Sequence, residues 1–296
     1  MARRLDSVRI VLVEPAGGLN VGAIARVMAN MGLSQLVLVN PQCDPLGDDA
    51  LLMAVHADGL LRQARQVDDL PTALAGCQRA IATTARTRAE MTLESPEAAL
   101  PWLIDQVENT PIETALIFGP ESRGLSNSEL NYAQRYVMIS SDSTYPSLNL
   151  AQAVAVCSYV LRRSALSSME STVDPSALSP RFKRAQGPEQ KNRDADLGQV
   201  GQDKSSTGSL SAFSAELSAA TAGEAGAALE QIDGYFQHLE SVLLKIGYLY
   251  PHTAASRLEK LRRLLYKAHA SEQELAMLRG ILRQVEWALS QAAADH

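Results

Sequence analysis

VRIVLVEPAGGLNVGAIARVMANM, residues 8–31, is the stretch that decides the fold. It begins with a run over residues 8–13 that is aliphatic apart from Arg9, continues through a turn containing Gly17 and Gly18, and ends in a helical pattern. An apolar run without alternation is typical of a strand that is buried on both faces of a parallel sheet. The stretch therefore predicts the strand, turn and helix with which an α/β fold begins.

The same alternation of apolar runs and helical patterns continues to about Arg163. Further strands are expected over residues 36–39, 79–84, 114–118 and 136–139. Helices are expected over residues 21–31, 49–56, 96–108, 127–133 and 150–163. Ser95 before Pro96, and the capping box of Ser126 with Glu129, mark two of the helix starts. We expect an α/β domain with a parallel sheet and helices on both faces.

The composition changes after Ser164. Residues 165–226 are rich in Ser, Ala, Gly and Gln and lack apolar periodicity, so we expect a disordered linker there. Helical spacing returns at Leu229 and ends at Gly247, and two more helices are expected over residues 254–270 and 273–290. The chain is thus expected to divide into a first domain over residues 1–164, a linker over 165–226 and a small all-helical domain over 227–296.

Length and charge restrict the classes of function. At 296 residues and 46% hydrophobic, the chain is long enough for two domains. The first apolar run is far too short for a signal peptide or a membrane span, so we expect a soluble cytoplasmic protein. The 3 cysteines lack Cys-x-x-Cys spacing, and no metal site is expected. A net charge of −6 excludes a generally basic coat, so any nucleic-acid contact must come from local clusters such as residues 257–267.

Four polar or glycine-rich segments follow strands of the expected sheet: residues 14–26, 83–86, 118–126 and 145–153. Each segment alone also fits a structural turn, and Ser147 and Asn149 also fit as helix caps. In an open α/β sheet, however, the carboxyl ends of parallel strands form the edge where ligands bind. Together the four segments predict a single binding site.

The first turn fits neither common nucleotide-binding motif. Gly17, Gly18 and Gly22 do not form G-x-G-x-x-G, and Asn40 rather than an acid follows the second strand. These two departures argue against a nicotinamide-dependent oxidoreductase. No Gly-Lys-Ser/Thr follows the turn either, which argues against a P-loop.

Three motifs together resemble those of the SpoU (TrmH) family of the SPOUT methyltransferase superfamily. They are Asn20-x-Gly22-x-x-x-Arg26, Gly119-x-Glu121-x-x-Gly124-Leu125-Ser126 and Ser147-Leu148-Asn149-Leu150-Ala151. Within the family, residues 83–86 and tail segments 235–240, 261–265 and 278–282 are most similar to the TrmJ-type tRNA ribose methyltransferases. The resemblance covers the chain apart from the expected linker.

The resemblance implies a fold, a cofactor and an activity. The fold would carry a deep C-terminal trefoil knot, which no pattern argument predicts because knots are so rare. The cofactor would be S-adenosyl-L-methionine, and the protein would be a homodimer. The activity would be 2′-O-ribose methylation of tRNA, at a pyrimidine of the anticodon loop of the position 32 type. Methylation of rRNA by the same mechanism, and a catalytically inactive RNA-binding module, remain as alternatives.

The resemblance also assigns roles to residues by matching positions. The catalytic set would be Arg26, Asn20, Glu121, Ser147 and Asn149. The cofactor would be surrounded by Thr83, Thr84, Ala85, Gly119, Ile139, Pro146, Ser147 and Leu148. RNA would be contacted by Arg86, Arg123, Arg257, Arg262 and Arg263. Because a guanidinium stays charged in proteins, Arg26 is expected to stabilise the developing alkoxide and the adjacent phosphate rather than to remove the proton.

Overall fold

The computed structural model describes residues 5–86, 91–105, 112–144, 147–170, 226–268 and 270–294. Its strands are β1 (Val8–Val13), β2 (Gln35–Val39), β3 (Arg65–Val67), β4 (Arg79–Thr83), β5 (Leu93–Glu94), β6 (Thr114–Phe118) and β7 (Arg135–Val137). They form a 7-stranded sheet in the order β3-β2-β1-β6-β4-β7-β5. Every pairing among these strands is parallel, as the unalternating apolar runs predicted.

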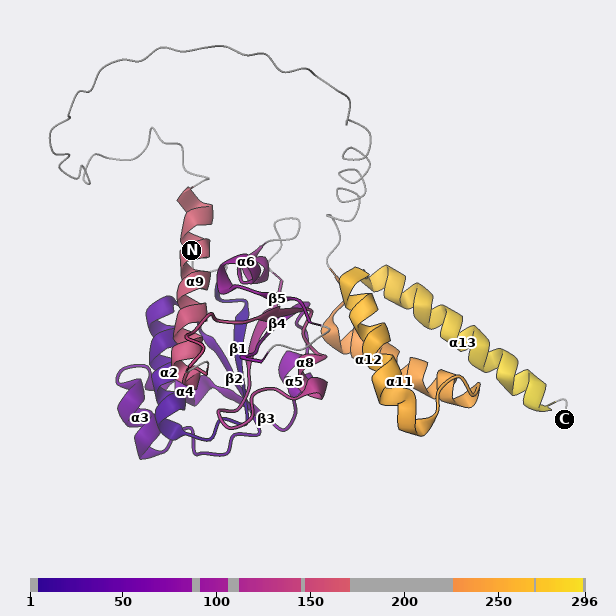
Figure 1. Cartoon of the computed structure of the whole chain (residues 1–296), viewed down its shortest axis with the longest axis horizontal. Helices are drawn as coiled ribbons and strands as arrows, with labels where there is room; N and C mark the ends of the chain where they lie inside the picture. Colours follow the sequence, from indigo (N-terminus) through magenta and orange to yellow (C-terminus); the bar gives the residue numbers. More distant parts are fainter. Residues whose placement is uncertain are drawn as a thin grey trace, which may run out of the picture.

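Helices cover both faces of the sheet, which confirms the predicted α/β architecture with a parallel sheet (Figure 1). On one face lie α2 (Gly18–Met31), α3 (Asp48–Ala54), α4 (Asp58–Gln63), α6 (Pro96–Ala99), α7 (Pro101–Ile104) and α9 (Leu150–Glu170). On the other lie α5 (Leu70–Leu74) and α8 (Asn127–Leu130), together with the tail helices α11 (Leu229–Lys245) and α12 (Pro251–Ala268), while α13 (Glu272–Ala294) packs against α11.

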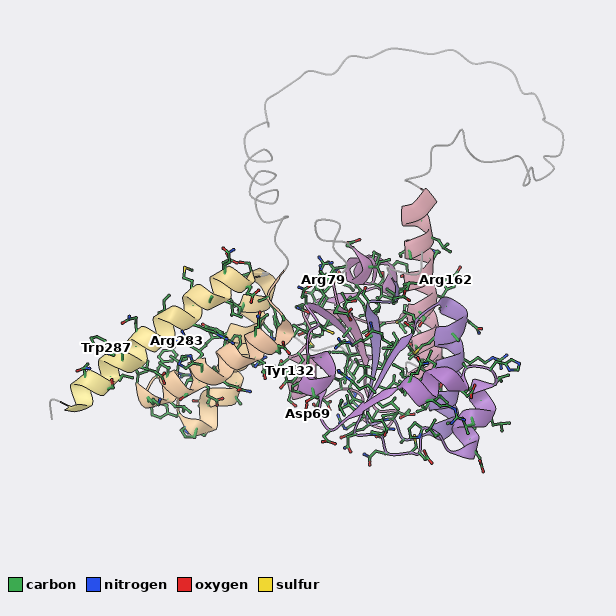
Figure 2. The ribbon with its side chains drawn as sticks, turned by 180° about the vertical axis from the view of Figure 1, so that it is seen from behind. Asp69, Arg79, Tyr132, Arg162, Arg283 and Trp287 are labelled. Atoms are coloured by element: carbon green, nitrogen blue, oxygen red, sulfur yellow. The ribbon has the colours of Figure 1, made fainter. Side chains whose placement is uncertain are left out.

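Close packing of α2 fixes the position of the first motif. A Cβ on Gly22 would come within 2.8 Å of the carbonyl carbon of Ala50, so glycine alone allows α3 to approach α2 this closely. At the other end of α2, the guanidinium of Arg162 on α9 donates a hydrogen bond to the carbonyl oxygen of Met31 at 3.0 Å (Figure 2). Both neighbours therefore hold α2 in place above the sheet.

The structure corrects two of the expected helices. The helix expected over residues 96–108 is broken at Leu100, because Pro101 has no amide hydrogen to continue it, and residues 106–108 lie outside the described residues. The helix expected to end at Arg163 continues to Glu170, and Ala165 is buried against the core. The expected domain boundary at Ser164 therefore lies inside α9, and most of the expected linker, residues 171–225, lies outside the described residues.

The tail packs directly against the sheet domain (Figure 1). The amide of Leu229, at the start of α11, donates to the carbonyl oxygen of Cys77 at 2.9 Å. The Arg262 guanidinium lies 4.7 Å from the ring centroid of Phe236 and 5.5 Å from that of Tyr132, which follows α8 (Figure 2). Asp233 of α11 pairs with the same guanidinium at 2.8 Å. One apolar cluster thus continues from the sheet into the tail.

Candidate active site

A cavity of about 400 Å³ opens at the carboxyl ends of β4, β6 and β7. This is the edge at which open α/β sheets bind ligands, and the volume lies within the usual range for small-molecule sites. The described lining residues are Thr83, Thr84, Ala85, Arg86, Phe118, Gly119, Pro120, Glu121, Ser122, Arg123, Gly124, Leu125, Val137, Ile139, Ser147, Leu148, Leu150 and Ala153. The set includes all the residues expected around the cofactor except Pro146, which lies outside the described residues.

The hydroxyl groups of the two threonines at the end of β4 form hydrogen bonds with backbone groups of the same chain. The Thr83 hydroxyl donates to the carbonyl oxygen of Ile117 at 3.0 Å. The Thr84 hydroxyl accepts from the amide of Arg86 at 3.1 Å and closes a tight turn. The polar groups that this turn offers to the cavity are therefore mainly those of the backbone, while Val137, Ile139 and their neighbours supply apolar surface.

Gly119 allows the second motif to fold back on itself beneath the cavity. A Cβ at Gly119 would come within 2.5 Å of the carbonyl carbon of Gly124 and would overlap the amide of Leu125. Gly124 has a φ of +66°, a conformation that side-chain-bearing residues rarely adopt. These two glycines of the motif are required by the backbone path, which brings Glu121 to the mouth of the cavity.

Three side chains from three separate motifs form one hydrogen-bonded chain. Nδ2 of Asn149, at the start of α9, donates to Oδ1 of Asn20 on α2 at 3.0 Å. Nδ2 of Asn20 donates to Oε1 of Glu121 at 2.8 Å. Oδ1 of Asn149 accepts from the amide of Ala151 at 2.9 Å, so Asn149 also caps α9 as its sequence position suggested. The structure therefore brings together three of the five expected catalytic residues by direct hydrogen bonds.

The other two expected catalytic residues differ in their placement. Ser147 lines the cavity beside Leu148. Arg26 is exposed on α2, does not line the cavity, and makes no hydrogen bond or ion pair with the rest of the described chain. It lies on the side of α2 that also carries Leu19, which is 50% exposed, because positions seven apart share a helix face.

Arg123 has internal partners that its sequence position did not indicate. Its guanidinium donates to both carboxylate oxygens of Glu129, at 2.8 and 2.9 Å, and to Glu14 at 2.7 Å. Glu129 in turn accepts from the Ser126 amide and completes the predicted capping box. Burial opposes ionisation of Glu129, but the hydrogen bonds from Arg123 and Ser126 outweigh it and lower its pKa to about 2. Arg123 therefore braces the second motif, and with 40% of its side chain exposed its contact with RNA stays a prediction.

The expected RNA-binding arginines of the tail fall into two groups. Arg262 is held at the domain junction by Asp233, with 15% of its side chain exposed, and Arg263 pairs with Glu259 at 2.6 Å. Arg257 is exposed and lies over the ring of Tyr248. Arg86 is also exposed and lines the cavity. Arg86, Arg123 and Arg257 are thus the exposed cations of the expected set, and among them Arg123 is the one paired with carboxylates in the described residues.

Several cavity residues could have been found from the sequence but were not. Val137 lies two positions before the expected Ile139, at the end of β7, and both line the cavity. Leu150 and Ala153 lie on the first turn of α9, three apart and on one helix face. The contact of Arg123 with Glu14 has no such signal, because these residues come from different motifs 109 positions apart.

The sequence matches two family models, one over each part of the chain. Residues 7–159 match the SpoU rRNA methylase family, and residues 230–295 match the C-terminal domain of the tRNA methyltransferase TrmJ. The first match covers the sheet, the cavity and all three motifs. The chain belongs to the SpoU methylase family.

Two relatives that match along nearly the whole chain are TrmJ proteins. The tRNA (cytidine/uridine/adenosine-2′-O-)-methyltransferase TrmJ of Pseudomonas aeruginosa is 36% identical and matches over 95% of each chain. The tRNA (cytidine/uridine-2′-O-)-methyltransferase TrmJ of Pectobacterium atrosepticum is 32% identical, over 95% of this chain and 98% of its own. The crystal structure of TrmJ from Zymomonas mobilis superposes with a TM-score of 0.68 at 28% identity, over 94% of this chain and 98% of that one.

Proposed function

We propose that the protein transfers a methyl group from S-adenosyl-L-methionine to a ribose 2′-hydroxyl of tRNA, at a pyrimidine of the anticodon loop. The observation that carries the proposal is the hydrogen-bonded chain of Asn20, Glu121 and Asn149, one residue from each family motif, in which Glu121 lines the cavity. The full-length relatives named as tRNA 2′-O-methyltransferases support the substrate, because the similarity includes the tail.

The cavity fits the cofactor in size and in chemistry. Its volume of about 400 Å³ suits a nucleoside-sized ligand. Backbone groups of residues 83–86 and 119–124 would hold the polar parts, since the threonine hydroxyls are already occupied. Val137, Ile139 and Leu148 would contact the flat base. When bound, S-adenosyl-L-methionine supplies an electrophilic methyl group on a sulfonium, and the sulfur leaves as a neutral thioether.

The residues of this chain position the nucleophile. A new bond forms between the ribose oxygen and the methyl carbon while the hydroxyl loses its proton, so negative charge develops on that oxygen. Asn20 and Asn149 fix the orientation of Glu121, which is the single carboxylate among the described lining residues. Arg26 would stabilise the developing alkoxide and bind the adjacent phosphate, two roles that suit a guanidinium.

Arg26 supports a homodimer as the active form. In its own chain it is exposed and does not line the cavity, so it would act in the cavity of a second copy. Large apolar side chains are exposed nearby on neighbouring elements, including Leu19 on α2, Leu52 on α3 and Tyr159 on α9. An exposed apolar surface of this kind is typical of a subunit interface.

The remaining expectations complete the proposal. We infer a trefoil knot at the third motif, a catalytic domain that extends to the end of α9, a linker, and a helical tRNA-binding domain that begins near residue 227. No helix in the described part of the chain is long and apolar enough to span a membrane. The described residues include no group of three potential metal ligands either. Because tRNA is its substrate, the enzyme would act in the cytoplasm.

The decisive experiment is methyl transfer from radiolabelled S-adenosyl-L-methionine to tRNA and, separately, to rRNA. The full chain should label tRNA at a ribose of the anticodon loop, and Arg26→Ala should lose most of that activity while keeping calorimetric cofactor binding. Labelling of rRNA alone would identify the substrate as ribosomal. Cofactor binding without any transfer would indicate an RNA-binding module, and Arg26→Ala with full activity would show that its assigned role is wrong.

A further inference from the structure

The turn between α11 and α12 presents two large aromatic rings to solvent. Leu249 is buried and anchors the turn, and its amide donates to the carbonyl oxygen of Leu243 at 3.0 Å. Its neighbours Tyr248 and Tyr250 consequently project outward and are 58% and 57% exposed. Gly247, with a φ of +74°, allows the chain to reverse here. The exposure of the two rings is thus fixed by the backbone of the turn.

Planar polar groups lie against both rings. The Arg257 guanidinium lies 5.8 Å from the ring centroid of Tyr248, and its Nη1 donates to the Tyr248 carbonyl oxygen at 3.1 Å. The rings of Tyr250 and His252 are stacked at 6.0 Å with an angle of 23° between their planes. We call Tyr248, Tyr250, His252 and Arg257 the aromatic turn.

The sequence around the aromatic turn contains basic residues and no acid, and of its cations Lys245 pairs with Glu286 of α13 at 2.7 Å. No Asp or Glu occurs between Glu240 and Glu259, although the net charge of the chain is −6. Arg257 has no carboxylate partner among the described residues, in contrast to Arg262 and Arg263. An exposed cation that is already oriented against a ring is available to a phosphate or to the face of a base.

We propose that the aromatic turn binds unpaired RNA nucleotides, whose bases stack on Tyr248 and Tyr250 and whose phosphate or base contacts Arg257. Stacking on exposed aromatic rings beside an arginine is the way in which proteins bind single-stranded nucleic acid. Duplex RNA cannot use these rings, because its bases are already stacked. The choice of RNA as the ligand rests on the proposed function. The aromatic turn would make the tail bind an unpaired RNA loop more tightly than a base-paired stem.

The test uses the full chain and two fluorescent RNAs, a hairpin with an unpaired loop and a blunt duplex of the same stem. Fluorescence anisotropy should show the variant Tyr248→Ala/Tyr250→Ala binding the hairpin about tenfold more weakly, with duplex binding unchanged. Tyr248→Phe/Tyr250→Phe keeps both rings and should bind like the original protein. Trp287→Ala is the matched control, because Trp287 is 61% exposed toward the free end of α13, outside the aromatic turn (Figure 2).

The outcomes separate this inference from the proposed function. If the alanine pair binds the hairpin normally, if the loss is equal on the duplex, or if Trp287→Ala loses as much, the aromatic turn does not bind unpaired bases. In methyl transfer to tRNA, the alanine pair should raise KM with kcat retained. Absence of methyl transfer by the original protein would instead overturn the proposed function, whatever the aromatic turn binds.

Discussion

Asn149 donates a hydrogen bond from Nδ2 to Oδ1 of Asn20 at 3.0 Å, although the two residues lie 129 positions apart. Asn20 is the middle member of this series of hydrogen-bonded side chains, because its own amide nitrogen donates to Glu121. The orientation of the Asn20 amide is consequently fixed at both ends, with oxygen toward Asn149 and nitrogen toward Glu121.

Asn20→Asp should therefore reduce kcat for methyl transfer by about 100-fold, the scale of a displaced catalytic group. An aspartate keeps the acceptor for Asn149 but places a second carboxylate against Glu121. Single-turnover transfer measures the effect, and calorimetry should show cofactor binding retained. Asn131→Ala, outside the cavity, is the control and should retain full activity.

Gly119→Ala should weaken cofactor binding by about tenfold or more, about 1.4 kcal/mol. The added Cβ would overlap the backbone of Gly124 and Leu125, so the loop that lines the cavity must move. Calorimetric titration with S-adenosyl-L-methionine compares the affinities of the original protein and Gly119→Ala. Gly280→Ala on α13 meets open space and should bind normally while gaining up to about 1 kcal/mol of stability. Equal affinities of the original protein and Gly119→Ala would contradict the tight-loop account.

The ion pair of Glu129 with Arg123 should make stability depend on pH. Its folded-state pKa of about 2 lies below the ordinary 4.5, so the ionised carboxylate stabilises the fold above about pH 4.5, and this contribution is lost as pH falls toward 2. Glu129→Gln should cost about 2 kcal/mol at pH 7, the scale of a charge-assisted hydrogen bond. In urea unfolding measured from pH 7 down to pH 3, the difference in the free energy of unfolding between the original protein and Glu129→Gln should become smaller. A difference that stays constant would mean that the ion pair adds nothing.

Arg262→Met should destabilise the junction between tail and sheet by about 3 kcal/mol. The reason is that Asp233, with 17% of its side chain exposed, would be left without its partner. The double variant Arg262→Met/Asp233→Leu removes both charges and should recover much of the loss. A double-mutant cycle measured by urea unfolding gives the coupling free energy between Arg262 and Asp233. If the losses in the free energy of unfolding are additive, the two residues do not act as a pair.

The core of the fold was predictable because it depends on local sequence. β1 and β6 occupy the predicted ranges, since each is a run of apolar residues with a single exception, Arg9 in β1 and Thr114 in β6. The edge strands β3 and β5 were missed because they are short and only partly buried, so no apolar run distinguishes them. Helix ends were predictable where a cap exists, as at Ser126, and less so for α9, which continues past its expected end.

The site was predictable as a set of motifs but not as a geometry. The family resemblance brought Asn20, Glu121 and Asn149 into one site, and their hydrogen bonds follow from the sheet bringing three distant loops to one edge. The positions of Arg123 and Arg262 were not predictable, because a basic residue gives no sequence signal of whether a carboxylate will lie beside it. Both arginines were expected to face RNA, and both have internal partners.

Docking of α11 against the sheet domain, through Leu229 and the shared apolar cluster, has a consequence for how this sequence can vary. The contact surfaces of the two domains set the orientation of the tail. The sequence between the domains should therefore have little effect on that orientation. Insertions and deletions between residues 171 and 225 should be tolerated as long as the chain can still reach. Substitutions on the contact surfaces of the two domains, by contrast, should be tolerated mainly when a second substitution on the opposite surface compensates for the first.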